Sequence, residues 1–412
     1  MSRRFPNFLD AYCEYANDGF IPPQFNVWTA LSIMAGALER KVWLPWTDTY
    51  SFYPNIYVLL ISMPGDGKSM ALGTGVKLLQ AVNAKTSAIN IMPNQVTEAK
   101  FIELMGNGKS FTERKLDREV IHRQNAGYYF ASEASNELKN VFGDFIACLT
   151  SFYDCPDTWE RGTKKDGKKI QLANVCMNMI AGSTFDYLGK LVNDENIQGG
   201  FASRLIYVVS KNKEVFDQKF QIGIGNSSTE RDAYREALIE DLTAISRMVG
   251  PMKATPEFGK AWEAWYPAFE RKRRGLISEK LQSLLARTNT NVLKVAILLS
   301  AAESDDRELR VEHWNRAVEL VLPVYDGIPS LFRQARANSS DPANINVASA
   351  IIAMVERESG LNKERIQNKL GTRKGIRHHQ IDQAIQSLVG EKILGRDAAG
   401  GLYLVGNTDD HF

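Results

Sequence analysis

A glycine-rich turn between an apolar strand and a helix constrains the fold of this chain more than any other feature. Residues 54–62 are predicted to form a short buried strand, and a helix is predicted to follow the turn. The turn ends in Gly67, Lys68 and Ser69, as in the pattern G-x-x-x-x-G-K-[ST] of phosphate-binding loops. The first position of the pattern is Ser62 instead of Gly. Because a small residue is tolerated where a strand becomes a loop, we still expect a phosphate-binding loop at 62–69.

The residues of this loop match the chemistry of a bound nucleotide. Lys68 would neutralise the β- and γ-phosphates, and the hydroxyl of Ser69 would bind Mg²⁺. The backbone N–H groups of the loop and the N-terminus of the helix would face the phosphates. We therefore predict that ATP and Mg²⁺ bind at Pro64, Gly65, Asp66, Gly67, Lys68, Ser69 and Met70. The alternative is a strand–turn–helix corner that binds no nucleotide.

A carboxylate at the end of a second apolar strand is a candidate catalytic base. The stretch YYFASEAS places Glu133 just after that strand, where it can polarise an attacking water. The preceding position, at which an Asp would help to hold Mg²⁺, is Ser132. This departure affects hydrolysis more than nucleotide binding. The alternative role for Glu133 is to cap the following helix, where a negative charge is favourable.

Other polar residues stand next to apolar segments. Ser183 and Thr184 end the strand ANVCMNMIAGST, where a hydroxyl can contact the γ-phosphate or cap the next helix. Arg204 precedes the strand LIYVV, and it can reach a phosphate held by the next subunit or form a surface ion pair. Arg287 and Lys294 are two helical turns apart, so either can lean over the nucleotide or remain solvated.

The order of secondary structure predicts an α/β fold. Strands alternate with helices from residue 54 to about 210, which is typical of a parallel sheet flanked by helices. A length of 412 residues allows two or three domains. We predict an N-terminal helical segment at 1–45, an α/β core at 46–212, a helical lid at 226–337 and a small domain at 345–406.

Taken in order, these motifs resemble those of AAA+ P-loop ATPases, and more closely the MCM-like helicases. The chain resembles still more closely an uncharacterised phage and prophage replication ATPase family, through FNVWTALSIMAGALERKVWL, SFYDCPDTWERGTKKDGKKIQLANVCMNMIAGST and GGFASRLIYV. The resemblance spans about residues 20–325. It implies a P-loop AAA+ core with Walker A at Lys68 and Ser69, the Walker B glutamate at Glu133, the first sensor at Ser183 or Thr184, the arginine finger at Arg204 and the second sensor at Arg287.

A basic hairpin is the first candidate for DNA contact. The stretch TWERGTKKDGKKIQLANV contains the turn signal Asp-Gly, so it is predicted to form a hairpin. Its tip carries Lys164, Lys165, Lys168 and Lys169. In MCM-like ATPases a hairpin at this place projects into the channel of the ring, so the resemblance implies contact with a DNA backbone. The alternative is a solvated surface hairpin.

Residues 345–406 are the second candidate for DNA contact, because their pattern is typical of a winged-helix domain. Three predicted helices precede two short strands around Gly400. Basic residues gather at the start of the third helix, where a helix-turn-helix presents groups to DNA: Arg373, Lys374 and Arg377. The alternative is a protein–protein module with a basic rim.

Composition excludes some classes of protein and leaves others open. The net charge of +2 gives no overall basic or acidic character, so any nucleic-acid surface must be local. The four cysteines form no C-x-x-C pair, which favours reduced thiols over a zinc site. The N-terminus has no apolar run of a signal peptide, and no apolar stretch is long enough to span a bilayer. We therefore expect a cytoplasmic protein without membrane contact.

The favoured hypothesis is an ATP-dependent DNA helicase or translocase of phage or mobile-element replication. It would act on single-stranded or forked DNA as a homo-oligomer, with a hexameric ring, ATP sites between subunits and possible replisome partners. A helicase loader or replication initiator, which binds DNA and remodels a partner without unwinding, is the alternative. A nucleotide-bound scaffold with negligible turnover is the third hypothesis, and it follows from Ser132.

Overall fold

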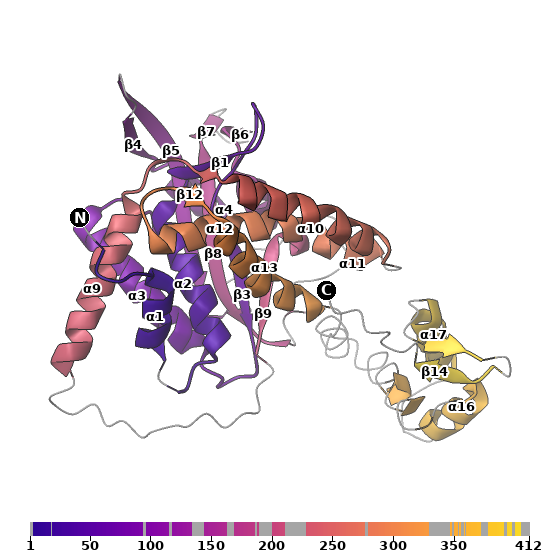
Figure 1. The fold of residues 1–412 in the computed structure, drawn as a ribbon. Helices are drawn as coiled ribbons and strands as arrows, with labels where there is room; N and C mark the ends of the chain where they lie inside the picture. Colours follow the sequence, from indigo (N-terminus) through magenta and orange to yellow (C-terminus); the bar gives the residue numbers. More distant parts are fainter. Residues whose placement is uncertain are drawn as a thin grey trace. The chain divides into compact units, whose positions relative to one another are not determined.

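The fold is α/β, and its main feature is a five-stranded, mostly parallel sheet (Figure 1). The chain divides into two compact units, one of Met1–Thr184, Asp194–Leu276 and Lys280–Tyr325, the other of Phe185–Asn193, Ile277–Glu279 and Asp326–Phe412. The computed structural model describes residues 3–17, 19–93, 96–114, 118–133, 144–162, 169–185, 188, 200–210, 228–276, 279–328, 347, 350–352, 354–355, 358, 360–371, 378–390, 394–397 and 400–404. The predicted small domain at 345–406 lies within the second unit, whereas most of the other predicted segments lie within the first.

The strands of the main sheet run in the order β4-β5-β8-β3-β9. Neighbours are parallel except for the edge strand β4, which is antiparallel to β5. The sheet comprises β3 Tyr57–Ile61, β4 Lys109–Arg114, β5 Glu119–Ala131, β8 Val175–Ser183 and β9 Leu205–Val209. Strand β8 is buried along its whole length, as expected for a parallel strand that is covered on both faces.

Helices cover both faces of this sheet. The described helices up to residue 326 are α1 Phe8–Ala16, α2 Pro23–Leu38, α3 Lys68–Thr86, α4 Glu98–Met105, α6 Asp144–Tyr153, α9 Ser228–Ser246, α10 Pro256–Arg274, α11 Glu279–Leu284, α12 Thr288–Glu303 and α13 Val311–Asp326. Helices α2 and α3 pack against β8 on one face, where Gly36 of α2 lies against the ring of Tyr128. On the other face the Tyr57 hydroxyl donates to Leu149 O of α6 at 2.8 Å, and Phe101 of α4 packs edge-on against Tyr129.

Two hairpins project from the amino ends of the parallel strands (Figure 1). One is β4–β5, and the other pairs β6 Thr158–Gly162 with β7 Lys169–Ala173 in antiparallel fashion. The backbone N–H of Ala173 donates to the Asn125 side chain of β5 at 2.7 Å, which joins the bases of the hairpins. The predicted basic hairpin is therefore confirmed at its strands, while residues 163–168 at its tip lie outside the described residues.

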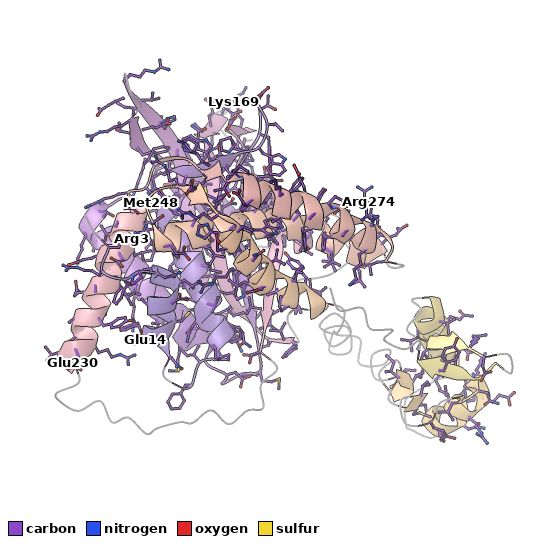
Figure 2. The ribbon with its side chains drawn as sticks, in the orientation of Figure 1. Arg3, Glu14, Lys169, Glu230, Met248 and Arg274 are labelled. Atoms are coloured by element: carbon purple, nitrogen blue, oxygen red, sulfur yellow. The ribbon has the colours of Figure 1, made fainter. Side chains whose placement is uncertain are left out.

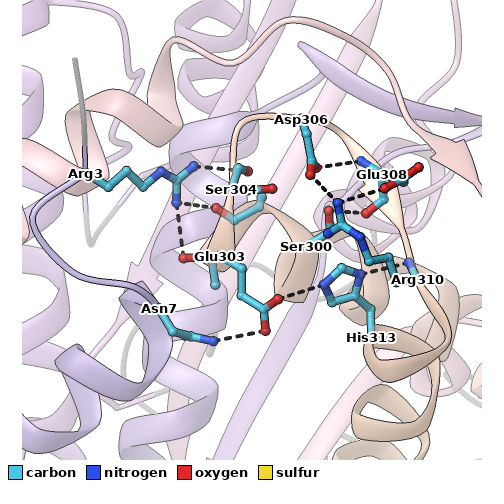
Figure 3. A network of polar contacts seen from close by, with 11 residues as sticks. Arg3, Asn7, Ser300, Glu303, Ser304, Asp306, Glu308, Arg310 and His313 are labelled. Atoms are coloured by element: carbon cyan, nitrogen blue, oxygen red, sulfur yellow. Dashed lines mark hydrogen bonds and ion pairs between the residues drawn. The ribbon is translucent and has the colours of Figure 1, made fainter.

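The N-terminal segment is fastened to the carboxyl end of α12 (Figure 3). The guanidinium of Arg3 donates to the carbonyls of Ala301 and Ala302 at 2.6 and 3.2 Å and pairs with Asp305. A cation at this place binds the carbonyls that a helix leaves without partners at its end. Nearby, buried His313 accepts from the Arg310 N–H through Nδ1, so its Nε2 donates to Glu303 at 3.0 Å. This network joins the first and last parts of the first unit.

Short strands complete the first unit. A sheet of order β10-β1-β2 and a pair β11–β12 connect the region after α2 with the helices beyond residue 228. Their bounds are β1 Val42–Pro45, β2 Ser51–Phe52, β10 Gly250–Pro251, β11 Lys253–Ala254 and β12 Glu308–Leu309. Strands β10, β11 and β12 interrupt the segment 226–337, which the sequence predicts as a helical lid. Ile91 forms an isolated bridge with Tyr128 of β5.

The second unit has its own apolar core. Its described elements are α16 Lys363–Gly371, α17 His378–Gly390, β13 Leu394–Arg396 and β14 Leu402–Leu404, the last two antiparallel. Side chains from all of them are buried together: Ile366, Leu370, Ile381, Ile385, Leu394 and Leu402. Gly400 has φ of 79°, which a turn between the two strands requires and glycine adopts without strain. No helix in the described ranges of the chain is long and apolar enough to cross a membrane.

The close approach of α2 and α3 makes a testable prediction about two glycines of one helix. A Cβ on Gly75 would lie 2.3 Å from Thr29 Cγ2, whereas a Cβ on Gly73 would meet no atom within 4 Å. We expect Gly75→Ala to lower the free energy of unfolding by about 1–3 kcal/mol through overpacking. The matched control Gly73→Ala should raise it by up to about 1 kcal/mol, because Ala favours helix over Gly. Urea unfolding of both variants checks this, and an equal effect of the two would contradict the packing.

Candidate functional site

The predicted phosphate-binding loop forms the turn between β3 and α3. Gly65 and Gly67 have φ of 94° and 76°, a region that glycine enters without strain. A Cβ on Gly65 would meet nothing within 4 Å, so the space above the loop is open. Ser69 is exposed in the first turn of α3. An exposed hydroxyl beside an open, glycine-lined turn fits a phosphate with its Mg²⁺.

Lys68 folds back over the loop. Its ammonium donates to the carbonyl oxygens of Ser62 and Met63 at 3.0 and 2.8 Å and to the Ser62 hydroxyl at 2.9 Å. Ser62 is fully buried, and its hydroxyl donates to Met63 O at 3.2 Å. The residue that departs from the glycine pattern is thus one of the acceptors for Lys68. Partial burial lowers the pKa of Lys68, while the charges of Asp66 and Glu133 act to raise it.

The carboxyl ends of three neighbouring strands meet at this loop. Strand β8 lies between β3 and β5, with Ser183 in register with Ile61 and Ala181 in register with both Leu59 and Ala131. Glu133 is exposed two residues beyond β5, and its charge acts on Lys68. Parallel strands bring their carboxyl ends to one edge of the sheet, which is where such folds bind ligands. The described structure therefore brings together the predicted phosphate loop, the predicted base and the predicted first sensor.

The two candidate sensor hydroxyls differ in exposure. Ser183 is fully buried, and its hydroxyl donates to Thr184 O at 3.2 Å. Thr184 is half-buried at the end of β8. Of the two, Thr184 has the more accessible side chain at the edge where the loop lies.

Arg204 lies at the opposite end of the same sheet. The residue after it, Leu205, pairs with Tyr57 at the beginning of β3, whereas the phosphate loop follows the end of β3. A strand of five residues separates these two ends by about 16 Å. Arg204 donates to Gly200 O at 2.7 Å and pairs with Asp154. Its Nε is buried and has no hydrogen-bond partner among the described residues.

Arg287 joins Arg204 on the same carboxylate, where its Nη1 lies 3.2 Å from Asp154. Both guanidinium groups approach the ring of Tyr153, at 5.7 Å for Arg204 and 6.0 Å for Arg287. The structure thus brings the predicted finger and the predicted second sensor together, but away from the phosphate loop of their own chain. In the described conformation Arg287 does not lean over that loop.

Lys294 is buried beneath this cluster and not solvated, which corrects the expectation of an exposed face on α12. Its ammonium lies 3.8 Å from the ring centre of Tyr153 and donates to Asn55 Oδ1 at 2.7 Å. Asn55 in turn donates to Tyr153 O at 2.9 Å. Burial lowers the pKa of Lys294 to about 8. A small pocket beside it is lined by side chains that include Tyr50, Thr290 and Arg287.

Three residues of this cluster have no signal in the sequence. Tyr153 ends α6, Asp154 follows it, and Asn55 lies before β3, so only the fold assembles the three. The one available hint is that each stands next to an apolar segment that the sequence identifies correctly. Their shared function is to hold Arg204, Arg287 and Lys294 in place.

Lys169 is the one predicted DNA-contacting residue among those that the structure describes. Lys164, Lys165 and Lys168 at the hairpin tip, and Arg373, Lys374 and Arg377 of the C-terminal domain, lie outside the described residues. Lys169 is described at the start of β7 (Figure 2), where it is exposed and lies 3.9 Å from Glu160 on the facing strand. These roles stay predictions.

Comparisons with known proteins give no family. No model of a known protein family matches the chain, and no curated protein matches it significantly.

Among the described residues, no group of three or more His, Cys, Asp or Glu side chains is placed to hold a metal ion.

The contacts of Lys68 predict different effects for two substitutions in the loop. Lys68→Ala removes the charge that faces the phosphates, so we expect ATP affinity to fall by at least tenfold, about 1.4 kcal/mol. Ser62→Ala removes only one of three acceptors of the resting ammonium, so we expect the Kd to change by less than about fivefold. Titration calorimetry measures both. Unchanged affinity in Lys68→Ala would refute the phosphate-loop assignment.

Burial of Lys294 predicts a stability that rises with pH. Its folded pKa of about 8 lies below the ordinary value of 10.5, so between these values the unfolded chain binds more protons. The free energy of unfolding should therefore rise across this interval. Relative to Lys294→Met, which has no such group, we expect a gain of roughly 2 kcal/mol between about pH 8 and pH 10. If the free energies of unfolding of the wild type and of Lys294→Met changed equally with pH, the prediction would be contradicted.

Proposed function

We propose that this chain is an ATP-dependent DNA translocase or helicase of phage or mobile-element replication, with AAA+ architecture and ATP sites between subunits of a ring. One observation carries the proposal. The carboxyl ends of β3, β5 and β8 bring a lysine over a glycine-rich loop, an exposed glutamate and a strand-end hydroxyl to one edge of a parallel sheet. Such a set supports phosphoryl transfer by positioning and charge.

Each residue of this edge has a role in hydrolysis. Lys68 leaves the carbonyls of Ser62 and Met63 and binds the β- and γ-phosphates. Glu133 accepts the proton of the attacking water, and Thr184 or Ser183 orients that water or the γ-phosphate. Ser69 would hold a Mg²⁺ together with the phosphates, and the ion would supply positive charge to the triphosphate. With Ser132 in place of an Asp, Mg²⁺ has fewer ligands from the chain.

The cluster at the other end of the sheet supports a ring. Arg204 and Arg287 lie about one strand length from their own phosphate loop, too far to bind a phosphate there. A head-to-tail arrangement of subunits would set this end of one chain against the phosphate loop of the next. Arg204 would then act as a finger in trans, released from Asp154 by the negative charge of the neighbouring triphosphate.

DNA contact is proposed for the β6–β7 hairpin and for the second unit. The hairpin projects from the sheet, and Lys169 on it is exposed. The second unit combines helices α16 and α17 with the β13–β14 hairpin, an arrangement that supports a winged helix. Contacts through lysines would bind the phosphate backbone without reading sequence.

The proposed activity predicts that DNA stimulates hydrolysis of ATP. We expect the purified protein to hydrolyse ATP faster with single-stranded DNA and to unwind a forked duplex. Glu133→Gln should lower kcat by at least about 100-fold and leave ATP binding intact, because only the base is removed. A phosphate-release assay and a strand-displacement assay measure these rates. Stimulated hydrolysis without unwinding would favour the loader, and no hydrolysis at all would contradict the enzyme.

Sites shared between subunits predict that two inactive variants complement each other. Arg204→Ala and Lys68→Ala should each lack activity alone, whereas a mixture should recover part of it, because some interfaces then hold an intact lysine and an intact arginine. Arg274→Ala is a matched control, since Arg274 is exposed on α10 (Figure 2) and pairs with Glu270. It should keep full activity. A mixture as inactive as its components would contradict the trans role of Arg204.

A further inference from the structure

Three large apolar side chains are exposed around the phosphate-binding loop. Met63 belongs to the loop itself and is 62 % exposed, and Met70 in the first turn of α3 is 48 % exposed. Phe20, in the segment before α2, is 41 % exposed. An exposed cluster of large apolar groups is unusual on a protein surface and commonly marks a binding site. Phe20 has no sequence motif that would single it out.

Phe20 is held beside the loop by a close backbone contact. A Cβ on Gly67 would lie 2.7 Å from the Phe20 carbonyl oxygen and 3.2 Å from Ile21 Cα. Gly67 is therefore needed for two reasons, its φ of 76° and the approach of this second segment. The segment reaches the loop from the N-terminal helices, far away in sequence. This approach sets the backbone of Phe20 beside the loop.

The chemistry of a nucleotide indicates which group would bind to these exposed side chains. Phosphates bound at the loop leave the base one ribose away, and the base needs an apolar surface for its flat face. An aromatic ring stacks on any base, and flexible methionine side chains adapt to aromatic rings. We propose that Phe20, with Met63 and Met70, forms the platform on which the base of a bound nucleoside triphosphate stacks. This inference rests on the proposed function, because it requires phosphates at Lys68.

If this platform exists, Phe20 contributes to the affinity for the base of ATP and not to the affinity for its phosphates. The probes are ATP and inorganic tripolyphosphate, each with Mg²⁺, titrated by calorimetry. Wild-type protein should bind ATP more tightly than tripolyphosphate. Phe20→Ala should weaken ATP binding by roughly tenfold, a typical effect of losing one stacked ring, and leave the tripolyphosphate affinity unchanged.

Two controls separate stacking from a general loss of apolar surface. Ile121→Ala removes a side chain that is 74 % exposed on the β5 part of the β4–β5 hairpin, at the other end of the strand from the loop, and should leave both affinities unchanged. Phe20→Trp keeps an aromatic ring, so it should retain ATP affinity. Its indole fluorescence should change with ATP and not with tripolyphosphate.

The outcomes distinguish this inference from the function on which it rests. If wild-type protein binds neither probe, the phosphate site and the platform both fail. If it binds both probes and Phe20→Ala weakens them equally or not at all, the platform alone is overturned. If Phe20→Ala instead breaks the oligomer while ATP affinity is kept, the exposed cluster is a contact between copies of the chain, and the platform is again overturned.

Discussion

The pairing of β8 with both β3 and β5 is the constraint on which the rest of the structure depends. Residues of β8 are in register with β3 on one side and β5 on the other, so the three strands end at the same edge. Complete burial of β8 between helices on both faces fixes this register, because a slip by one residue would turn every side chain to the opposite face. Lys68, Glu133 and Ser183 owe their proximity to this pairing alone.

The same strands separate two chemical environments at their two ends. The carboxyl end has an open glycine-lined loop and an exposed glutamate. The amino end has two arginines on one aspartate above a buried lysine, with Asn55 joining that lysine to the turn before β3. A single chain cannot bring these ends together, because the strand between them is stiff. An assembly of chains can, and this is the physical basis for sites shared between subunits.

Local pattern was enough to predict the elements that position the loop. The apolar run before Gly67, the strand before Ser132 and the antiparallel hairpin on either side of residues 163–168 all form as predicted. Each of these signals lies within a short stretch of sequence. The extension of β5 back to Glu119 and its pairing with β4 were missed, although 119–123 alternate between exposed and half-buried side chains as a hairpin does.

Long-range contacts explain what the sequence could not predict. The spacing of Arg287 and Lys294 on a helix indicates a shared face, but only the packing of α12 buries one and pairs the other with Asp154. The sequence shows that Ser62 replaces the first glycine of the loop pattern. Only the structure shows that its hydroxyl accepts a hydrogen bond from Lys68. Phe20 reaches the loop through a backbone contact with Gly67, which no motif records.

A structure with Mg²⁺ and a non-hydrolysable ATP analogue tests the central claim most directly. The account predicts that the Lys68 ammonium leaves the carbonyls of Ser62 and Met63 and binds the β- and γ-phosphates, with the γ-phosphate facing Glu133. It also predicts that Arg204 of an adjacent subunit approaches the same phosphate. A triphosphate bound elsewhere, with Lys68 still on those carbonyls, would contradict it.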